Sequence, residues 1–276
     1  MSDSVSDGLN AAANLAKAVP IYDDALKPLA IETGKALGTA GRVVNACLAP
    51  IRGAVWGAEK IEDWLNEKVA SKLEGTPEEK IVSPDLIIAG PTIEALKFRG
   101  ANGELSEMFA NLLASSMTKG ERELSHPSFV EKIKMLNSLD ARLFAFISKE
   151  VNVPTLEVLV KYGGRPGHSR VFKCLNSDLF EVLRETHSEF SRPAELILAS
   201  IENLSGLGLI TYSAELWLTS ENAQKKYEAM KEHPLIKTLY DNFPTGPQFD
   251  NSVKSYGKSM IQITQVGKDF ARVVFR

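Results

Sequence analysis

The chain has 276 residues, of which 44% are hydrophobic and 24% are charged, and this composition is typical of a globular protein with room for two domains. Its net charge of −3 at pH 7 argues against a general nucleic-acid coat protein, which is normally basic. Because no stretch holds about 18 uninterrupted apolar residues, and the N-terminus lacks a basic region before an apolar core, we expect neither an ordinary transmembrane helix nor a secretory signal.

The N-terminal part of the chain has a helical pattern. We expect residues 1–9 to be disordered and residues 10–136 to form one all-helical domain, because apolar side chains recur there with the spacing of a helix face. The clearest element is the amphipathic segment 59–73, whose apolar positions are spaced by four: Ile61, Leu65, Val69 and Leu73.

Proline and glycine residues divide the rest of this domain. We expect the segment 81–90 to be extended or to form a turn, because Pro84 and Pro91 both restrict their neighbours, and we expect Pro91 to begin a helix. Further helices are predicted over 104–117 and after Pro127.

The segment 33–58 stands apart within this domain, since it is rich in glycine and apolar residues and carries three cations but no acid. It holds two GxxxG spacings, which allow two helices to approach closely. The candidate residues for membrane or helix contact are Gly34, Gly38, Arg42, Leu48, Ile51, Arg52, Gly53, Val55, Trp56 and Gly57.

Two interpretations of this segment remain open. In the first, its helices pack closely against each other in a soluble domain. In the second, they lie flat on an anionic membrane surface, where each cation contributes about 1 kcal/mol of binding. A helix that spans the membrane is disfavoured, because placing Arg42 or Arg52 at the centre of the bilayer costs about 2.5–3.5 kcal/mol.

The C-terminal part, residues 137–276, has a different pattern. Helices are predicted over 140–149 and 178–186, and a third begins at Pro193 and ends in the sequence LSGLGLITY, residues 204–212. A helix, a glycine stop and a β-branched strand in this order are typical of the recognition helix and wing of a winged helix.

The second wing strand is predicted over 259–264, followed by a last helix over 268–274. Between the wing strands lies an insertion, residues 214–258, with a helix over 221–231 and a proline-rich loop. The predicted fold is therefore mainly α, with an N-terminal helical domain followed by a winged-helix-like α+β domain that carries this insertion.

Three arginines of the C-terminal part are candidate contacts for nucleic acid or a partner: Arg165, Arg170 and Arg192. The first two lie in or next to a glycine-rich loop that lacks the ending of a phosphate-binding P-loop. The helix that would read DNA contains Glu195 and Glu202 and no Lys or Arg, so phosphate repulsion favours a protein-interaction or dimer module over DNA binding.

The sequence offers no catalytic, cofactor-binding or metal-ligating pattern. The four histidines lack metal-ligand spacing, and Cys47 and Cys174 lie far apart. We therefore predict a protein that is not an enzyme and that uses no cofactor and no metal.

Four pieces of the chain, in this order and spacing, resemble the abortive-infection alpha family of bacterial proteins. They are VPIYDDALKPLAIETGKALGTAGRVVNACLAPIRGAVWGAEKIEDWL (19–65), IVSPDLIIAGPTIEAL (81–96), ELSEMFANLLASSM (104–117) and HPSFVEKIKMLNSLDA (126–141). The resemblance implies a role in defence against bacteriophage, in which an infected cell stops growing or dies before phage matures. It supplies no catalytic residues that could be carried over.

The hypothesis that joins these observations is a non-enzymatic anti-phage factor in the cytoplasm. Its C-terminal region would sense a phage protein or hold a homo-oligomer, and its N-terminal helices would act as effector, peripherally at the inner membrane when activated. The alternative is a regulatory module whose winged helix binds nucleic acid or protein and whose helical domain dimerises. A third interpretation is a nuclease or nucleotide enzyme with a site assembled from scattered residues.

Overall fold

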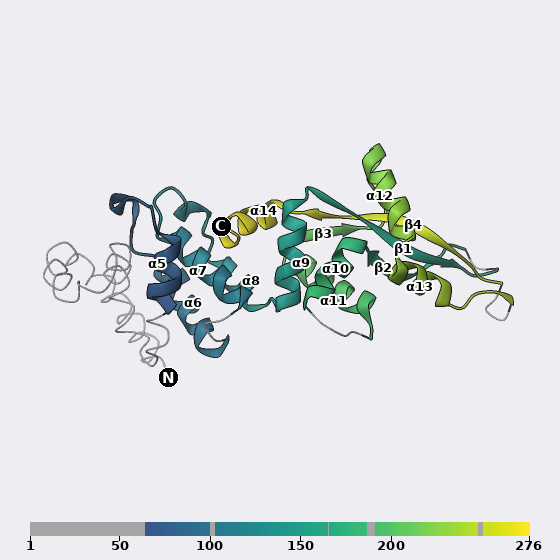
Figure 1. Ribbon diagram of the computed structural model, residues 1–276, viewed down its shortest axis with the longest axis horizontal. Coiled ribbons are helices and arrows are strands. Elements are labelled where there is room, and N and C mark those ends of the chain that lie inside the picture. Colours follow the sequence, from purple (N-terminus) through teal and green to yellow (C-terminus); the bar gives the residue numbers. More distant parts are fainter. Residues whose placement is uncertain (1–63, 100–102, 165, 187–190, 248–250) are drawn as a thin grey trace, which may run out of the picture.

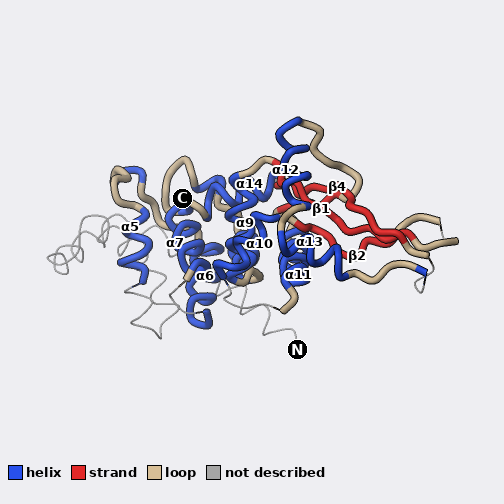
Figure 2. The backbone as a smooth tube through the Cα atoms, turned by 45° about the vertical axis from the view of Figure 1, so that its right-hand side comes forward, coloured by secondary structure: helices blue, strands red, loops and turns tan. Residues whose placement is uncertain are grey.

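The computed structural model describes residues 64–99, 103–164, 166–186, 191–247 and 251–276 of the chain (Figure 1). Helices gather at one end of the molecule, and a small antiparallel sheet extends at the other (Figure 2). The fold is thus mainly helical with an α+β part, as the sequence predicts. Before the sheet, the chain forms the π-helix η2 (Leu65–Val69), α5 (Ala70–Lys72), the 3₁₀ helix η3 (Glu78–Lys80), α6 (Leu86–Arg99), α7 (Glu104–Ser116), the 3₁₀ helix η4 (Arg122–Leu124), α8 (Ser128–Lys134) and α9 (Ser138–Lys149).

Helix α7 lies at the centre of the helical end. The prediction of a helix over 104–117 is confirmed. Of the apolar side chains predicted to share one face, Leu105 is partly buried and the others are buried: Met108, Phe109, Leu112 and Leu113. The described part of the amphipathic segment packs on α7 through the buried residues Val69 and Leu73, and the indole Nε1 of Trp64 donates to Ser106 Oγ at 2.6 Å. The segment 33–58 lies outside the described residues.

Helix α6 corrects the expectation of an extended segment over 81–90. The helix begins at Leu86, and Pro91 lies inside it rather than at its start. Asp85 stabilises the start, because its Oδ1 accepts a hydrogen bond from the backbone N–H of Ile87 at 3.0 Å. Pro91 removes one helical hydrogen bond, and the remaining bonds and the burial of Ile88 and Ile93 outweigh that loss.

The sheet has four strands in the order β2-β1-β4-β3, and every neighbouring pair is antiparallel. The strands are β1 (Asn152–Lys161), β2 (Ser169–Leu175), β3 (Ile210–Ser213) and β4 (Val253–Ile263). The sequence did not indicate β1 and β2. Most of β1 is buried on both faces, so it lacks the alternation of a half-exposed strand.

Pro154 is a second reason why the sequence did not indicate β1, because proline normally argues against an inner strand. Its carbonyl accepts a hydrogen bond from Asn176 Nδ2 at 2.8 Å, so this residue faces the β2 side of β1. Strand β2 ends at Leu175, opposite Leu156, and therefore does not reach Pro154. The missing N–H costs no hydrogen bond between β1 and β4.

The helices after β2 follow the prediction in part. Helices α10 (Ser177–Thr186) and α11 (Pro193–Gly206) lie where they are expected, and α12 (Glu221–Lys231) confirms the helix within the insertion. Helix α13 (Pro234–Asn242) replaces part of the expected loop. Strand β4 begins at Val253, six residues before the expected strand 259–264, so the last part of the insertion is strand that pairs with β1.

Strands β3 and β4, which overlap the segments predicted as wing strands, pair with each other, with Ile210 opposite Ile263 and Ser213 opposite Met260. The insertion between them packs on the sheet. The hydroxyl of Tyr227 on α12 donates to the carbonyl of Ser259 on β4 at 2.8 Å and accepts from the backbone N–H of Leu218 at 3.2 Å.

Helix α14 (Gln265–Val274) carries the chain from the sheet back to the helical end (Figure 1). It starts close to the end of α11, since a Cβ built on Gly267 would lie 2.0 Å from the carbonyl oxygen of Leu209, so only glycine fits. The buried ring of Phe270 then packs between the rings of Phe129 and Phe144, at 5.1 and 5.6 Å. The buried hydrophobic residues of both ends consequently form one cluster.

Candidate functional site

The start of helix α9 is built by a reciprocal pair of side chains. The backbone N–H of Asp140 donates to Asn137 Oδ1 at 2.8 Å, and the backbone N–H of Asn137 donates to Asp140 Oδ2 at 3.0 Å. This arrangement is a capping box, and it places the Asp140 carboxylate in the first turn of the helix, where the helix dipole stabilises negative charge.

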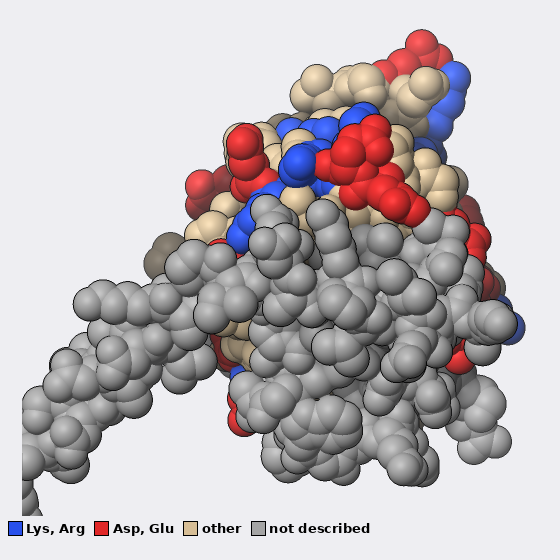
Figure 3. Space-filling model, turned by 90° about the vertical axis from the view of Figure 1, so that its left-hand side faces the viewer, with Lys and Arg blue, Asp and Glu red and all other residues tan. Residues whose placement is uncertain are grey.

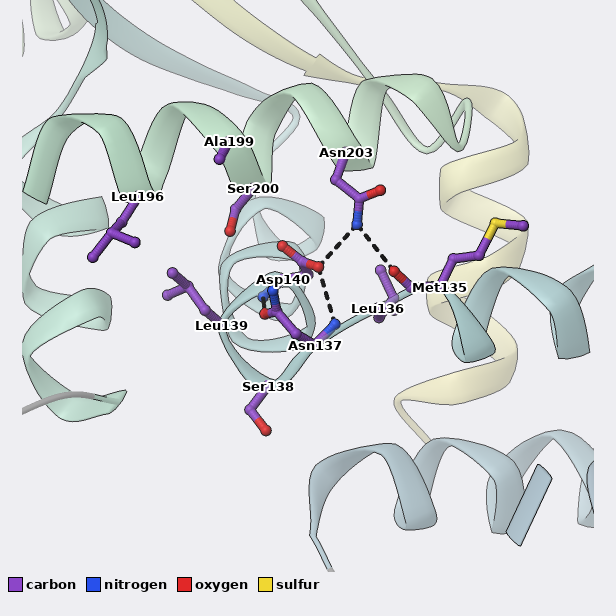
Figure 4. Close-up of a pocket in the computed structure, with 10 residues that line it drawn as sticks. All are labelled: Met135, Leu136, Asn137, Ser138, Leu139, Asp140, Leu196, Ala199, Ser200 and Asn203. Atoms are coloured by element: carbon purple, nitrogen blue, oxygen red, sulfur yellow. Dashed lines mark hydrogen bonds between the residues drawn. The ribbon is translucent and has the colours of Figure 1, made fainter. Parts of the chain in front are cut away.

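Helix α11 reaches the same carboxylate from the other side. Asn203 Nδ2 donates to Asp140 Oδ2 at 2.9 Å and to the carbonyl of Met135 at 3.1 Å. Asp140 is only 2% exposed, and its second oxygen, Oδ1, is buried without a hydrogen-bond partner among the described residues. In Figure 4 one oxygen of the Asp140 carboxylate accepts both of the hydrogen bonds that are drawn to this carboxylate, and the other oxygen turns towards Ser200.

An open pocket with a volume of about 790 Å³ lies between these two helices (Figure 4). Its lining is half apolar and half polar: Met135, Leu136, Asn137, Ser138, Leu139, Asp140, Leu196, Ala199, Ser200 and Asn203. Met135 and Leu196 are exposed at 59% and 38%, so apolar surface lies at the mouth of the pocket.

The chemistry of this pocket suits binding better than catalysis. Among the described residues that line the pocket, Asp140 is the one ionisable side chain, so these residues do not supply the pair of titratable groups that acid–base catalysis normally uses. The same residues include no histidine or cysteine that could activate or act as a nucleophile. An acceptor oxygen beside apolar walls is instead suited to a ligand that donates a hydrogen bond.

A second buried acid, Glu157, lies on strand β1 and is fully engaged. It is 1% exposed, its Oε2 accepts from Arg170 Nε at 3.1 Å, and its Oε1 accepts from the hydroxyl of Tyr212. Burial and the hydrogen bond to Glu157 raise the pKa of Tyr212 above its usual value. Burial also raises the pKa of the Cys174 thiol, which makes that group a poor nucleophile.

These contacts bear on the arginines that the sequence singles out. Arg170 is engaged by Glu157, and Arg192, next to the start of α11, pairs with Glu195 at 3.2 Å. The structure therefore holds these two arginines on different acids and does not combine them into one site. Arg165 lies outside the described residues, as do all ten candidates between Gly34 and Gly57.

Charged side chains of both signs lie side by side at the helical end. Figure 3 shows Lys and Arg side chains beside Asp and Glu side chains on that face of the described chain. Lys68 and Lys72 both pair with Glu107, at 2.8 and 2.9 Å. No helix of the described residues is long and apolar enough to cross a membrane, and within the same residues no cluster of His, Cys, Asp and Glu could hold a metal ion.

Sequence reasoning missed the pocket, although one of its signals was visible. The segment Asn137 to Asp140 has the spacing of a capping box, which places an acid in the first turn of a helix. The sequence contains no signal for Asn203 and Ser200, because their place in the pocket depends on how α11 packs against α9.

Comparison with known proteins adds one clear match. The family model described as "Abortive infection alpha" matches residues 57–274, as the resemblance in the sequence predicts. No curated protein matches the chain. A solved structure titled "Structure of the uncharacterized protein from the hydrocarbon-degrading marine bacterium Alcanivorax borkumensis SK2" aligns over 54% of this chain and 92% of its own, with 12% identity and a TM-score of 0.32. A likeness this weak supports no conclusion about fold or function.

Proposed function

The chain belongs to the abortive infection alpha family, and from this premise we propose that it is a non-enzymatic anti-phage factor that stops an infected cell from producing phage. In this proposal the region from α9 to β4 senses a phage protein or holds a homo-oligomer. The N-terminal helices act as the effector, and they move from the cytoplasm to the surface of the inner membrane when the protein is activated.

The observation that carries the effector part is the composition of residues 33–58. This segment combines an apolar face (Leu48, Ile51 and Val55) with Arg42 and Arg52 and contains no acid. A stripe of this kind binds to an anionic membrane surface when it is exposed, and it aggregates or binds a partner if nothing covers it. We propose that it is buried in the resting state and released by the trigger.

Helix α14 supports communication between the two ends of the molecule. It follows β4 directly, and Asn111 Nδ2 on α7 donates to the carbonyl of Val274 on α14 at 2.8 Å, in a buried position. A shift of the sheet would therefore move α14 against α7, the helix that also packs against η2 and α5. Packed cores of this kind transmit displacement because they resist compression.

The test is the membrane potential of single cells that express the protein during the first minutes of phage infection. We expect depolarisation before lysis with the natural chain and none with the double variant Leu48→Glu and Val55→Glu. A matched control is the double variant Leu86→Glu and Ile87→Glu, which places the same charges at exposed positions of α6, 62% and 64% exposed, outside both the segment 33–58 and the region from α9 to β4, and should leave depolarisation intact. A steady potential combined with reduced phage yield would contradict the effector proposal.

We also propose that α11, β3 and the end of β4 act as a winged-helix-like unit that contacts protein rather than DNA. Two features support this choice: α11 carries exposed Glu202, and the neighbouring Arg192 is already paired with Glu195. An acidic helix repels phosphate. A gel shift with phage and host DNA at physiological salt tests the choice, and a shift that disappears with Arg192→Ala would establish the nucleic-acid alternative instead.

A further inference from the structure

We propose that the pocket between α9 and α11 binds a cationic side chain, arginine or lysine, presented by a peptide segment of a partner protein. The Asp140 carboxylate would accept its hydrogen bond through Oδ1. This ligand would be the trigger of the defence role proposed above, and the assignment of its biological source rests on that role.

The pocket contains a buried acceptor that is not used. Burying a polar atom without a hydrogen-bond partner destabilises the folded chain, and more strongly if the group is charged. Oδ2 of Asp140 has two donors, whereas Oδ1 has none within the described chain. A donor supplied by a ligand would remove that destabilisation, so the pocket is arranged for a hydrogen-bond donor.

The ion pairs around the pocket indicate that this donor is positively charged. The cationic side chains of neighbouring elements are engaged elsewhere: Lys132 Nζ donates to the carbonyl of Leu207, Lys134 pairs with Glu131 at 2.9 Å, and Arg142 pairs with Glu104 at 2.5 Å. Asp140 forms no ion pair with any described residue. A cationic ligand adds a charge-assisted hydrogen bond, which is about twice as strong as a neutral one, whereas a phosphate would be repelled.

The apolar side chains of the lining indicate the shape of the ligand. Leu139, Leu196 and Met135 line the pocket beside the acid and suit the methylene stem of an arginine or lysine side chain. The exposed thioether of Met135 can adapt to different stems. Because the pocket is open, an extended peptide can pass over its mouth while one side chain enters.

The experiment is an NMR titration of the full-length chain with three probes. The first is the tripeptide amide acetyl-Leu-Arg-Leu-NH₂, the second is the same peptide with neutral citrulline in place of arginine, and the third is spermidine. The readout is the side-chain NH₂ signal of Asn203, which donates to Asp140. We expect the arginine peptide to shift this signal and to bind at least about tenfold more tightly than the citrulline peptide.

Two variants locate the binding. Asp140→Asn keeps the shape of the side chain and one acceptor oxygen but removes the charge. We expect it to weaken the binding of the arginine peptide about tenfold or more. Ala199→Trp fills the pocket from the exposed face of α11 without changing Asp140, and it keeps the test decisive if Asp140→Asn folds poorly. The matched controls are Asp85→Asn, at the start of α6, and Ala229→Trp, at an exposed position of α12, and both should bind normally.

Absence of a shift, or equal binding by Asp140→Asn and Ala199→Trp, would overturn the proposal. Tighter binding of spermidine than of the peptide would overturn the peptide assignment and identify a free small cation. The titration uses purified protein, so it can fail while the membrane-potential result stands. Conversely, that result can fail while the pocket binds its peptide.

Discussion

Two regions of the molecule each bury a carboxylate, and they treat it differently. On the sheet, both oxygens of Glu157 have donors, Arg170 Nε and the hydroxyl of Tyr212. Between α9 and α11, the buried Asp140 uses one oxygen for two donors and leaves the other without a partner in the described chain. Glu157 on β1 binds Arg170 on the neighbouring strand β2 and Tyr212 on β3, across β4, whereas Asp140 lines an open pocket.

The difference teaches how to separate a structural acid from a candidate binding acid. A buried charge that is fully hydrogen-bonded holds its neighbours in place. Its removal leaves each of its buried partners without a hydrogen bond or an opposite charge. A buried charge with a free acceptor beside a pocket carries a cost that a ligand can remove. The comparison therefore predicts that substitutions at Glu157 and its partners change stability, and that substitution of Asp140 changes binding.

The largest effect is expected for Arg170→Met. This change keeps most of the side-chain volume and leaves the buried Glu157 charge without its cation. We expect a loss of about 2–3 kcal/mol in the free energy of unfolding, less than for a fully buried pair because the Arg170 side chain is 34% exposed. Urea unfolding measures it, and Arg184→Met, at an exposed pair on α10, should change stability by less than about 0.5 kcal/mol. Equally small losses of stability in both variants would show that Glu157 does not have the structural role assigned to it.

A smaller effect is expected for Tyr212→Phe, which removes one hydrogen bond to a buried charged acceptor. The expected loss is about 1–2 kcal/mol at neutral pH.

The same variant has a pH signature. The pKa of Tyr212 is raised in the folded chain, by burial first and by Glu157 second, so it lies above the unfolded value of about 10. The neutral phenol therefore stabilises the folded chain fully below about pH 10, and this contribution is lost as pH rises towards the folded pKa. In urea unfolding at about pH 8 and about pH 10.5, the advantage of the natural chain over Tyr212→Phe should shrink at the higher pH. An advantage that grows with pH would contradict the buried hydrogen bond.

The smallest effect on stability is expected for Asp140→Asn. The variant weakens the cap of α9, where an acid at a helix start contributes about 0.3–1 kcal/mol, but it also relieves the unpartnered buried charge. We expect the free energy of unfolding to stay within about 1 kcal/mol of the natural value. A loss as large as that of Arg170→Met would make Asp140 a structural acid like Glu157 and would end the contrast.

Much of the helical part could be predicted from the sequence. The apolar face of α7 could be recognised from its spacing, although most of this helix is buried on all sides. Helix α12, which buries one face and exposes the other, lies where a helix was predicted. Strand β1 could not be predicted, because it is buried on both faces and contains Pro154, whose tolerance depends on where β2 ends. Only the part of α6 before Pro91 was missed, because the cap formed by Asp85 starts the helix at Leu86 and Pro91 does not interrupt it.

The candidate pocket depends on contacts that sequence spacing does not encode. The capping box of α9 is local and could be recognised, but its exposure to a pocket is set by α11, which lies more than 50 residues later in the chain. Arg170 illustrates the converse. Its position next to a glycine-rich loop made it a candidate contact for nucleic acid or a partner, whereas its partner Glu157 lies on a strand that the sequence did not indicate.

The most direct test of the central claim is the efficiency of plating of a phage that the natural chain restricts. It should be measured on cells that express equal amounts of the natural chain, Asp140→Asn or Tyr212→Phe. We predict that Asp140→Asn loses protection although it is nearly as stable as the natural chain, and that Tyr212→Phe protects although it is less stable. Full protection by Asp140→Asn would contradict the claim that this acid, unlike Glu157, serves recognition.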